Sequence, residues 1–328
     1  MGLIPGGTSD ALTIWAVSDG RAGIEAQVLG LAEAVARLRP ANIVVKRIGW
    51  RAGLGRLPWR LIPPWARAGA AIAPPWPDIW IAAGRATLPL STRVRLWSAG
   101  ATLVVQTQDP RTGLAPFDLV IPPEHDGLVG PDVLPLVGAP NRLTEARLAA
   151  ELARFADRLA SLPHPRVALI VGGRSRAFAL PTAHAARLAD QVAKAVQAIG
   201  GSVLVSFTRR TPPAAAEAMR ARLSALPGLI WDGGGENPYF AFLAAADHIL
   251  VTEDSTNLAA DAAGTGKPVF ILPMAGRGGP RLRRFHADLE ARRITRRFAG
   301  ELSSWVYPPL RETDRAAAEV LRRHDARK

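Results

Sequence analysis

Side chains suited to an anionic, hydroxyl-rich ligand follow a short apolar run in the second half of the chain. Residues 249–251 predict a buried strand, and small apolar residues up to Ala263 predict a helix soon after it. A helix N-terminus behind a parallel strand offers unpaired N–H groups, and ligands of open α/β sheets lie at that edge. The alternative is a Ser or Asp helix cap without a ligand. The turn between strand and helix carries Thr252, Glu253, Asp254, Ser255, Thr256 and Asn257.

A glycine-rich basic loop predicts a second anion site. Residues 167–171 predict a strand, and a helix is expected over about residues 181–199. Glycines allow close backbone approach, and N–H groups beside Arg suit a pyrophosphate. The loop lacks the G-K-[ST] ending of a P-loop. Its residues are Gly172, Gly173, Arg174 and Ser175. Later strands end in further polar groups, namely Thr208, Arg209, Glu236, Asn237 and Tyr239.

The first half contains candidates for acid–base chemistry. Each of them follows a predicted strand, at the edge where chemistry is expected. The first turn, over residues 18–23, lacks the G-x-G-x-x-G fingerprint of dinucleotide sites. His125 has carboxylates on both sides, which favours a basic imidazole, although a loop histidine can also be a structural hydrogen bonder. The residues that compete for the role of general base are Asp19, Glu25, Asp109 and His125.

Predicted strands alternate with predicted helices throughout the chain, which indicates an α/β protein with mostly parallel sheets. The length of 328 residues suggests two domains. A Pro-His-Pro segment at residues 163–165 is interpreted as the linker. We therefore expect an N-terminal domain over residues 1–162 and a second domain over 163–310. A C-terminal helix over 311–328 can cross back to the first domain.

Composition limits the class of protein. The chain has no cysteine, which excludes disulfides and thiolate metal sites. Residues 1–10 lack a basic region and an apolar core, so no signal peptide is expected. No apolar run approaches the ~18 residues of a spanning helix. The net charge of +13 predicts an acidic partner, and the chain lacks a recognised nucleic-acid-binding module.

A basic, Trp-rich segment predicts contact with an anionic membrane over residues 50–76. Residues 34–77 contain no Asp or Glu. Arg and Trp interleaved with Leu and Ile are typical of interfacial surfaces. The alternatives are a Trp-lined rim of an active-site cleft and plain core packing. The residues of this composition are Arg37, Arg39, Lys46, Arg47, Arg51, Arg56, Arg60 and Arg67, with Trp50, Trp59, Trp65 and Trp76.

The motifs of both halves together resemble a known family. The second half combines Gly172-Gly173, Thr208-Arg209-Arg210, residues 235–239 (Gly-Glu-Asn-Pro-Tyr), residues 252–255 (Thr-Glu-Asp-Ser) and residues 266–269 (Gly-Lys-Pro-Val). The first half has residues 18–23 (Ser-Asp-Gly-Arg-Ala-Gly), 83–85 (Ala-Gly-Arg), 108–110 (Gln-Asp-Pro) and 123–126 (Pro-Glu-His-Asp). This set resembles the bacterial branch of the mitochondrial-fission ELM-like family. The second half is also similar in layout to the donor domain of GT-B glycosyltransferases.

The resemblance implies a GT-B-like fold, with two Rossmann-like domains facing a central cleft, and a nucleotide-sugar as substrate. By this likeness Gly172, Gly173, Arg174 and Ser175 would cradle phosphate, and Thr208 and Arg209 would neutralise it. Glu236, Asn237 and Tyr239 would lie near the base. Glu253, Asp254, Ser255 and Thr256 would hold ribose, diphosphate or sugar. No Asp-x-Asp motif occurs in these loops, so the resemblance implies neither a metal nor a cofactor.

The expected function is transfer of a sugar to a lipid-linked or other cell-envelope acceptor. The protein is expected in the cytoplasm, with peripheral binding to the inner membrane. A non-hydride nucleoside-diphosphate-sugar epimerase is the second hypothesis, because some relatives carry that label. A non-catalytic scaffold at a membrane is the third.

Overall fold

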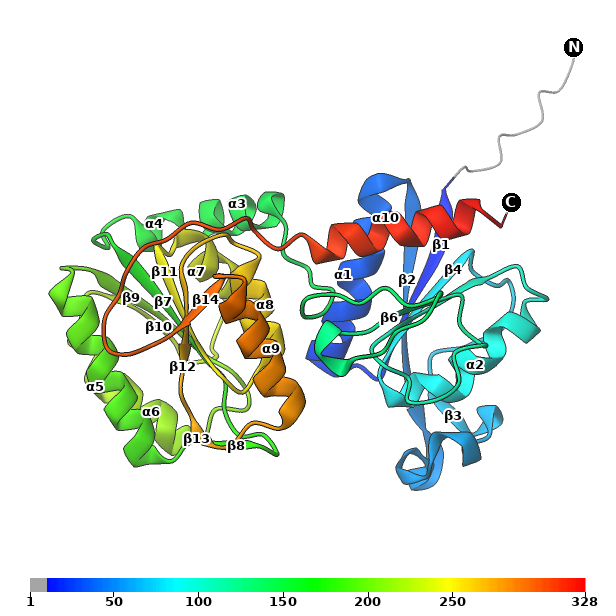
Figure 1. The fold of residues 1–328 in the computed structure, drawn as a ribbon, viewed down its shortest axis with the longest axis horizontal. Helices are drawn as coiled ribbons and strands as arrows, with labels where there is room; N and C mark the ends of the chain where they lie inside the picture. The colour runs from blue at the N-terminus through cyan, green and yellow to red at the C-terminus, as the bar shows by residue number, and fades with distance from the viewer. Residues whose placement is uncertain (1–10, 328) are drawn as a thin grey trace, which may run out of the picture. The chain divides into compact units, whose positions relative to one another are not determined.

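The computed structural model describes residues 11–327 and divides the chain into two compact units (Figure 1). Unit 1 comprises the chain up to Arg142 together with the chain from Arg311 onward, and unit 2 is Leu143–Leu310. The expectation that residues 1–10 hold no signal peptide lies outside the described residues. Among the residues that are described, no helix has both the length and the apolar character to cross a bilayer.

Unit 1 is built on a six-stranded sheet in the order β3-β2-β1-β4-β5-β6. All neighbours are parallel except β3, which pairs antiparallel with β2. The strands are β1 (Leu12–Ser18), β2 (Ala41–Trp50), β3 (Arg67–Gly69), β4 (Ile79–Ala83), β5 (Leu103–Thr107) and β6 (Leu119–Ile121). The α-helices are α1 (Ala22–Leu38), α2 (Leu88–Trp97) and α10 (Glu312–Asp325). Short 3-10 helices are η1 (Arg51–Arg56), η2 (Trp59–Leu61), η3 (Pro64–Ala66), η4 (Arg85–Thr87) and η5 (Glu124–Asp126).

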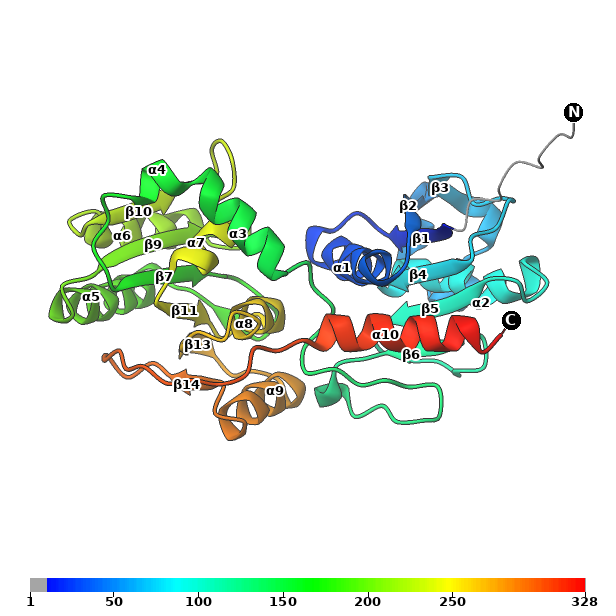
Figure 2. The same ribbon diagram turned by 90° about the horizontal axis from the view of Figure 1, so that it is seen from above.

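Two hydrophobic clusters hold unit 1 together, one on each face of the sheet. In the first, α1 and α10 pack on the strands through residues such as Val28, Leu31 and Val320. In the second, Trp80 and Val94 join strand residues to α2. The C-terminal helix is therefore an integral part of unit 1, because its apolar side chains belong to the cluster on one sheet face. Figure 2 shows the ribbon of α10 within this unit.

Unit 2 contains a six-stranded, wholly parallel sheet in the order β10-β9-β7-β11-β12-β14. Counted along the chain, this is the doubly wound order 3-2-1-4-5-6. Its strands are β7 (Arg166–Val171), β9 (Ser202–Phe207), β10 (Gly228–Trp231), β11 (His248–Thr252), β12 (Val269–Leu272) and β14 (Thr295–Arg297), and β8 (Phe178–Ala179) pairs antiparallel with β13 (Ala275–Gly276). The helices are α3 (Glu145–Arg154), α4 (Ala156–Leu159), α5 (Thr182–Ala198), α6 (Pro213–Leu223), α7 (Tyr239–Ala245), α8 (Thr256–Ala263) and α9 (Pro280–Ala291).

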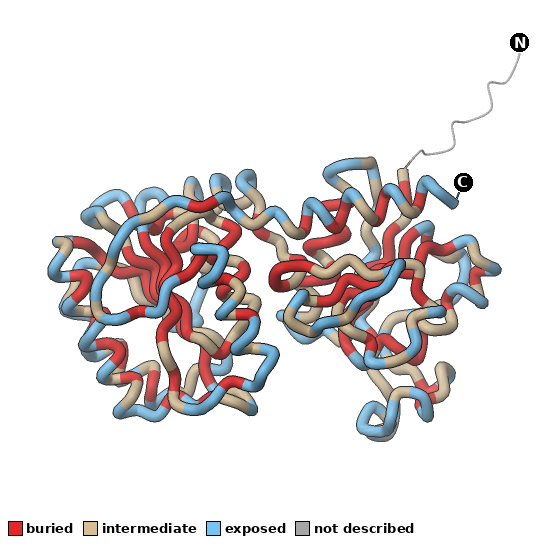
Figure 3. The backbone as a smooth tube through the Cα atoms, viewed as in Figure 1, coloured by how far each residue is buried: buried red, intermediate tan, exposed pale blue. Residues whose placement is uncertain are grey.

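The central strands of unit 2, β9, β7, β11 and β12, are almost fully buried, as the red tube through its centre shows (Figure 3). Apolar residues of α5 and α6 cover one face and pack with Leu169, Val205 and Leu250. Helices on both faces explain why these strands are continuous apolar runs without alternation.

The boundary between the units falls at Arg142 and Leu143, whereas the sequence indicated residues 162 and 163. Helix α3 packs against α7 and therefore belongs to unit 2. The proposed Pro-His-Pro linker lies inside unit 2, where the His164 ring contacts Asp247 Oδ2 at 2.6 Å. Helices α3 and α4 follow one another directly and meet at Phe155.

Candidate functional site

The predicted ligand-binding residues of unit 2 lie at the carboxyl ends of its parallel strands. Gly172 follows β7, Thr208 follows β9, and Glu253 follows β11. Strands β7 and β11 are neighbours, and the order of the sheet reverses between them. Open α/β sheets bind their ligands at such a switch point. The fold thus brings together the two motifs that the sequence analysis placed first.

The buried carboxylate of Asp254 connects the loops at this edge. Its side chain is fully buried and forms an ion pair with Arg210 at 2.7 Å. It also accepts hydrogen bonds from Gly173 N at 3.1 Å and from Thr252 Oγ1 at 2.7 Å. Thr252 Oγ1 in turn accepts from Gly172 N at 2.7 Å. A buried carboxylate with a cation and several donors is fully satisfied, so Asp254 fixes the loops rather than offering itself to a ligand.

The glycines of the β7 loop are required by protein packing. A Cβ atom on Gly172 would overlap Asp254 Oδ1, and one on Gly173 would overlap the carbonyl oxygen of Arg210. Both N–H groups already donate to side chains of the protein. The phosphate cradle predicted from these two glycines therefore needs correction: their N–H groups are occupied, and other donors must serve an anion.

Two arginines are candidates for binding such an anion. Arg174 and Arg209 are exposed at the ends of neighbouring strands β7 and β9, and within residues 11–327 neither forms an ion pair. The loops that carry them are rigid, because Arg174 N donates to Arg210 O at 3.0 Å. Thr208 N donates to Val171 O at 2.9 Å. Free guanidinium groups on a fixed backbone are suited to a diphosphate.

Ser175 and Ser255 both make local backbone contacts. Ser175 Oγ accepts from Ala177 N at 3.2 Å and from Phe178 N at 3.1 Å, which shapes the turn before β8. Ser255 is the N-cap of α8 and accepts from Leu258 N at 3.4 Å. The capping alternative is therefore present in the structure. Thr256 begins the helix, and the first N–H groups of a helix lack intrahelical acceptors.

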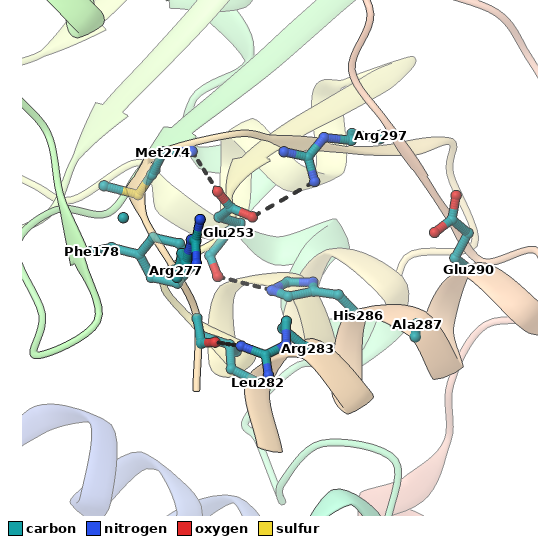
Figure 4. Close-up of a pocket in the computed structure, with 12 residues that line it drawn as sticks. Phe178, Glu253, Met274, Arg277, Leu282, Arg283, His286, Ala287, Glu290 and Arg297 are labelled. Atoms are coloured by element: carbon teal, nitrogen blue, oxygen red, sulfur yellow. Dashed lines mark hydrogen bonds and ion pairs between the residues drawn. The ribbon is translucent and has the colours of Figure 1, made fainter. Parts of the chain in front are cut away.

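Glu253 lies at an open pocket of about 620 Å³ within unit 2 (Figure 4). Its Oε1 accepts from Met274 N at 2.5 Å, and its Oε2 lies 4.0 Å from Arg297. The carbonyl oxygen of Glu253 contacts His286 Nε2 at 2.8 Å. Burial is the main cause that lowers the pKa of His286, so its imidazole is neutral near pH 7.

One wall of this pocket was not predicted from the sequence. The loop after β12 carries Gly276, Arg277, Gly278 and Gly279 and leads into α9. Arg277 and Arg283 both line the pocket beside Leu282 and Phe178. The signal was present, because a glycine-rich basic loop ahead of a helix is the pattern that singled out the β7 loop.

The three residues predicted near the base occupy the loop before α7 and its first turn. Glu236 is exposed and forms an ion pair with Arg154 of α3. Asn237 Oδ1 accepts from Tyr239 N at 3.0 Å, which shapes the start of the helix. The Tyr239 hydroxyl group donates to Asp261 Oδ2 at 2.9 Å. Asp261, on α8, was not singled out from the sequence.

The acid–base candidates of unit 1 also lie at carboxyl ends of strands. Asp19 follows β1 and forms an ion pair with Arg21 at 2.7 Å. Asp109 follows β5 and accepts from Arg111 N at 2.7 Å. His125 lies in η5 after β6 and is partly buried. Strands β5 and β6 are neighbours, whereas β4 separates β1 from β5, so the sheet groups Asp109 with His125 more closely than with Asp19.

Glu25 is the least suitable of the competing bases. Its two carboxylate oxygens accept from Arg47 at 2.7 and 2.8 Å. The hydrogen bond from Arg47 is the main cause that lowers the pKa of Glu25. A carboxylate held in this way is a weaker proton acceptor than an unpaired one.

Solved structures with the same fold include UDP-GlcNAc 2-epimerases. The enzyme from Methanocaldococcus jannaschii has a TM-score of 0.52 at 11% identity, covering 95% of this chain and 92% of that one. The enzyme from Neisseria meningitidis, bound to UDP-GlcNAc, has a TM-score of 0.51 at 11% identity, covering 95% and 98%. Os79 from O. sativa, in complex with UDP, has a TM-score of 0.52 at 12% identity, covering 96% and 94%. At these identities the likeness establishes the GT-B-type fold, with Rossmann-like units and mostly parallel sheets.

Sequence comparison identifies relatives of this chain. "Mitochondrial fission protein ELM1" of Arabidopsis thaliana is 31% identical over 278 residues, 76% of this chain. The match spans 65% of the plant protein, less than two thirds of its length. An uncharacterized protein of Rickettsia prowazekii (strain Madrid E) is 26% identical over 287 residues, 75% of this chain and 79% of the relative. The sequence model of the family "Mitochondrial fission ELM1" matches residues 22–324. The chain belongs to the mitochondrial fission ELM1 family.

Proposed function

We propose that unit 2 binds a nucleotide-sugar at the carboxyl edge of its sheet, and that the protein transfers the sugar to a cell-envelope acceptor. The observation that carries the proposal is the pair of exposed arginines, Arg174 and Arg209, on the loops after the neighbouring strands β7 and β9. The N-terminus of α8 follows β11, the strand on the other side of β7. Guanidinium groups and helix N–H groups are the donors that proteins use for diphosphates. Two fold neighbours, one bound to UDP-GlcNAc and the other in complex with UDP, support the same class of substrate.

The pocket beside Glu253 gives the sugar a place within the same unit. Its volume of about 620 Å³ is within the range of small-molecule sites. Glu253 is held by Met274 N and faces Arg297, so its carboxylate is oriented before a ligand arrives. A fixed carboxylate is a suitable acceptor for sugar or ribose hydroxyl groups. In this assignment Glu253 contacts the ligand, while the neighbouring Asp254 holds the loops.

The proposed reaction exchanges one bond at the anomeric carbon. The bond from this carbon to the diphosphate oxygen breaks, and the leaving diphosphate takes the electron pair. Arg174 and Arg209 would stabilise the developing negative charge. The acceptor hydroxyl oxygen forms the new glycosidic bond, and its proton passes to a base. Asp19, Asp109 and His125 are the proposed bases, and Asp109 and His125 follow adjacent strands.

Product analysis tests this assignment against the epimerase alternative, which is motivated by two fold neighbours that are UDP-GlcNAc 2-epimerases. The purified protein would be incubated with nucleotide-sugars, alone and with membrane extract as a source of acceptor. Transfer predicts release of nucleoside diphosphate only when acceptor is present, together with a new glycoside. A nucleotide-sugar with an inverted stereocentre in the absence of acceptor would reject transfer in favour of epimerisation. Binding without turnover under either condition would favour a scaffold.

A further inference from the structure

The segment between β2 and β3 exposes a cluster of apolar side chains. Leu57 is 39% exposed, Leu61 is 66% exposed and Trp65 is 78% exposed. We call these three residues, together with Arg51, Arg56 and Arg60, the docking tip. The segment starts at the carboxyl end of β2 and returns to the sheet edge as β3 (Figure 1). An exposed Trp beside exposed Leu side chains is uncommon on a surface that contacts only water.

The exposure is a property of an ordered segment. Ile62 and Ala66, next in sequence to Leu61 and Trp65, are 2% and 0% exposed. Trp59 packs on the core of unit 1, and Trp50 Nε1 donates to Ala86 O at 3.1 Å. The segment therefore buries one set of apolar side chains in unit 1 and presents another set to the outside.

The structure shows which tryptophans of this segment are packed in unit 1 and which one is exposed, a distinction that the sequence did not give. Trp76 packs in the core cluster and stacks on Trp97 at 6.0 Å between ring centroids. Trp50 and Trp59 are partly buried against the same cluster. Core packing therefore accounts for these three, and Trp65 alone of the four stands exposed.

The positive charge of the docking tip favours an anionic partner. Arg51, Arg56 and Arg60 are exposed within the same segment. Residues 34–77 contain no acidic residue, so nothing in this stretch neutralises them. Arg60 also donates to Thr112 Oγ1 at 2.9 Å, which ties its side chain to the loop after β5. Exposed Leu and Trp side chains in a segment that also exposes Arg side chains complement an anionic bilayer, where the apolar groups enter the interface and the cations meet phosphates.

We propose that the docking tip binds unit 1 to an anionic phospholipid bilayer. The tip also lies at the edge of the sheet that carries the proposed bases. The Arg85 side chain, after β4, donates to the carbonyl oxygen of Leu57, and Thr112 follows Asp109 on the β5 loop. A bilayer at the tip would bring a lipid-linked acceptor to the carboxyl edge of unit 1. Membrane binding by the tip does not depend on a nucleotide site in unit 2.

Co-sedimentation of the intact protein with vesicles tests the proposal. We expect binding to vesicles that mix phosphatidylcholine with phosphatidylglycerol, weaker binding to phosphatidylcholine alone, and a loss of binding as salt rises. Each basic residue near an anionic leaflet contributes about fivefold in affinity. Arg56→Gln with Arg60→Gln should therefore weaken binding by about 25-fold. The matched control is Arg187→Gln with Lys194→Gln, which removes the same charge from exposed positions on α5.

A second pair of variants tests the apolar contribution. Leu61→Ser with Trp65→Ser should weaken vesicle binding at least tenfold, since both side chains enter the interface. The control is Leu96→Ser with Val306→Ser, because those side chains are 81% and 94% exposed outside the tip. Equal binding to neutral and anionic vesicles, or equal losses in the tip and control variants, would overturn the proposal. Nucleotide titrations of the same variants test the proposed function independently, because the nucleotide site is assigned to unit 2 and the docking tip belongs to unit 1.

Discussion

The Tyr239 hydroxyl group donates a hydrogen bond to Asp261 Oδ2 at 2.9 Å and so joins the first turn of α7 to α8. Burial is the main cause that raises the pKa of Asp261 to about 7, against the opposing effects of the Tyr239 hydrogen bond and the Arg147 charge. Helix α8, which Ser255 caps, therefore carries a carboxyl group whose ionisation is sensitive to pH near neutrality.

This pKa predicts how stability depends on pH. Unfolded Asp261 has its ordinary pKa of 3.8, and the folded value is about 7, so the folded state binds the proton more tightly. Its contribution to the free energy of unfolding is fully present below the unfolded pKa and is lost as pH rises toward 7. Asp261→Asn, which can still accept from Tyr239, should flatten this decline. Urea unfolding across that pH range measures it, with exposed Asp157→Asn as control; an unchanged slope in Asp261→Asn would contradict the prediction.

The β7 glycines should tolerate no side chain. Gly172→Ala would drive its Cβ into Asp254, and Gly173→Ala would drive its Cβ into the backbone of Arg210. We expect each to cost about 1–3 kcal/mol of unfolding free energy, the usual cost of overpacking. Gly279→Ala is the matched control, because its Cβ would meet no atom within 4 Å. Chemical denaturation compares the three variants, and equal stability of all of them would show that the loop is not packed as described.

Ser255 allows capping to be separated from ligand binding. Ser255→Ala removes the acceptor for Leu258 N and should cost about 1 kcal/mol of stability. Ser255→Asp keeps a cap but places a negative charge where a diphosphate would bind. We therefore expect Ser255→Asp to melt like the parent protein and to lose nucleotide affinity. A parent-like affinity in Ser255→Asp would show that α8 serves packing alone.

Variants of Glu253 also separate an effect on stability from an effect on ligand binding. Glu253→Gln retains an amide oxygen for Met274 N, so its melting temperature should stay near that of the parent. Glu253→Ala leaves that N–H without its acceptor and should cost about 1–3 kcal/mol. If Glu253 holds ligand hydroxyl groups, both variants should weaken nucleotide-sugar binding by roughly tenfold, in line with the loss of one charged hydrogen bond. Calorimetry beside thermal melts distinguishes the two effects.

The sequence alone predicted α/β units with mostly parallel sheets, and it placed the candidate residues of unit 2 after the carboxyl ends of their strands. Continuous apolar strands and glycine-punctuated turns depend on local chemistry, so the loops after β7, β9 and β11 were found without a structure. The sequence did not predict which residue of each motif holds the loops and which one faces a pocket. Glu253 and Asp254 are adjacent carboxylates, and only burial shows that Asp254 holds the loops while Glu253 lines a pocket.

The same limit applies to the arginines and to the unit boundary. Arg209 and Arg210 have one chemistry, yet Arg210 pairs with Asp254 and Arg209 has no such partner in the described chain. The loop over residues 276–279 lines the pocket because β12, the strand before it, pairs with β11. This pairing is not visible in the sequence. The boundary was misplaced because the packing of α3 on α7 is a long-range contact that no local pattern reports.

The most direct test of the central claim is calorimetric titration of the intact protein with nucleoside diphosphates and their sugar conjugates. The account predicts saturable binding of at least one, with a Kd below the millimolar range. It also predicts that Arg174→Ala with Arg209→Ala weakens that binding at least tenfold without lowering the melting temperature, because both guanidinium groups are exposed. Arg187→Ala with Lys194→Ala, on α5, should leave the binding unchanged. No heat of binding with any ligand at millimolar concentration, or equal affinity in both double variants, would contradict the account.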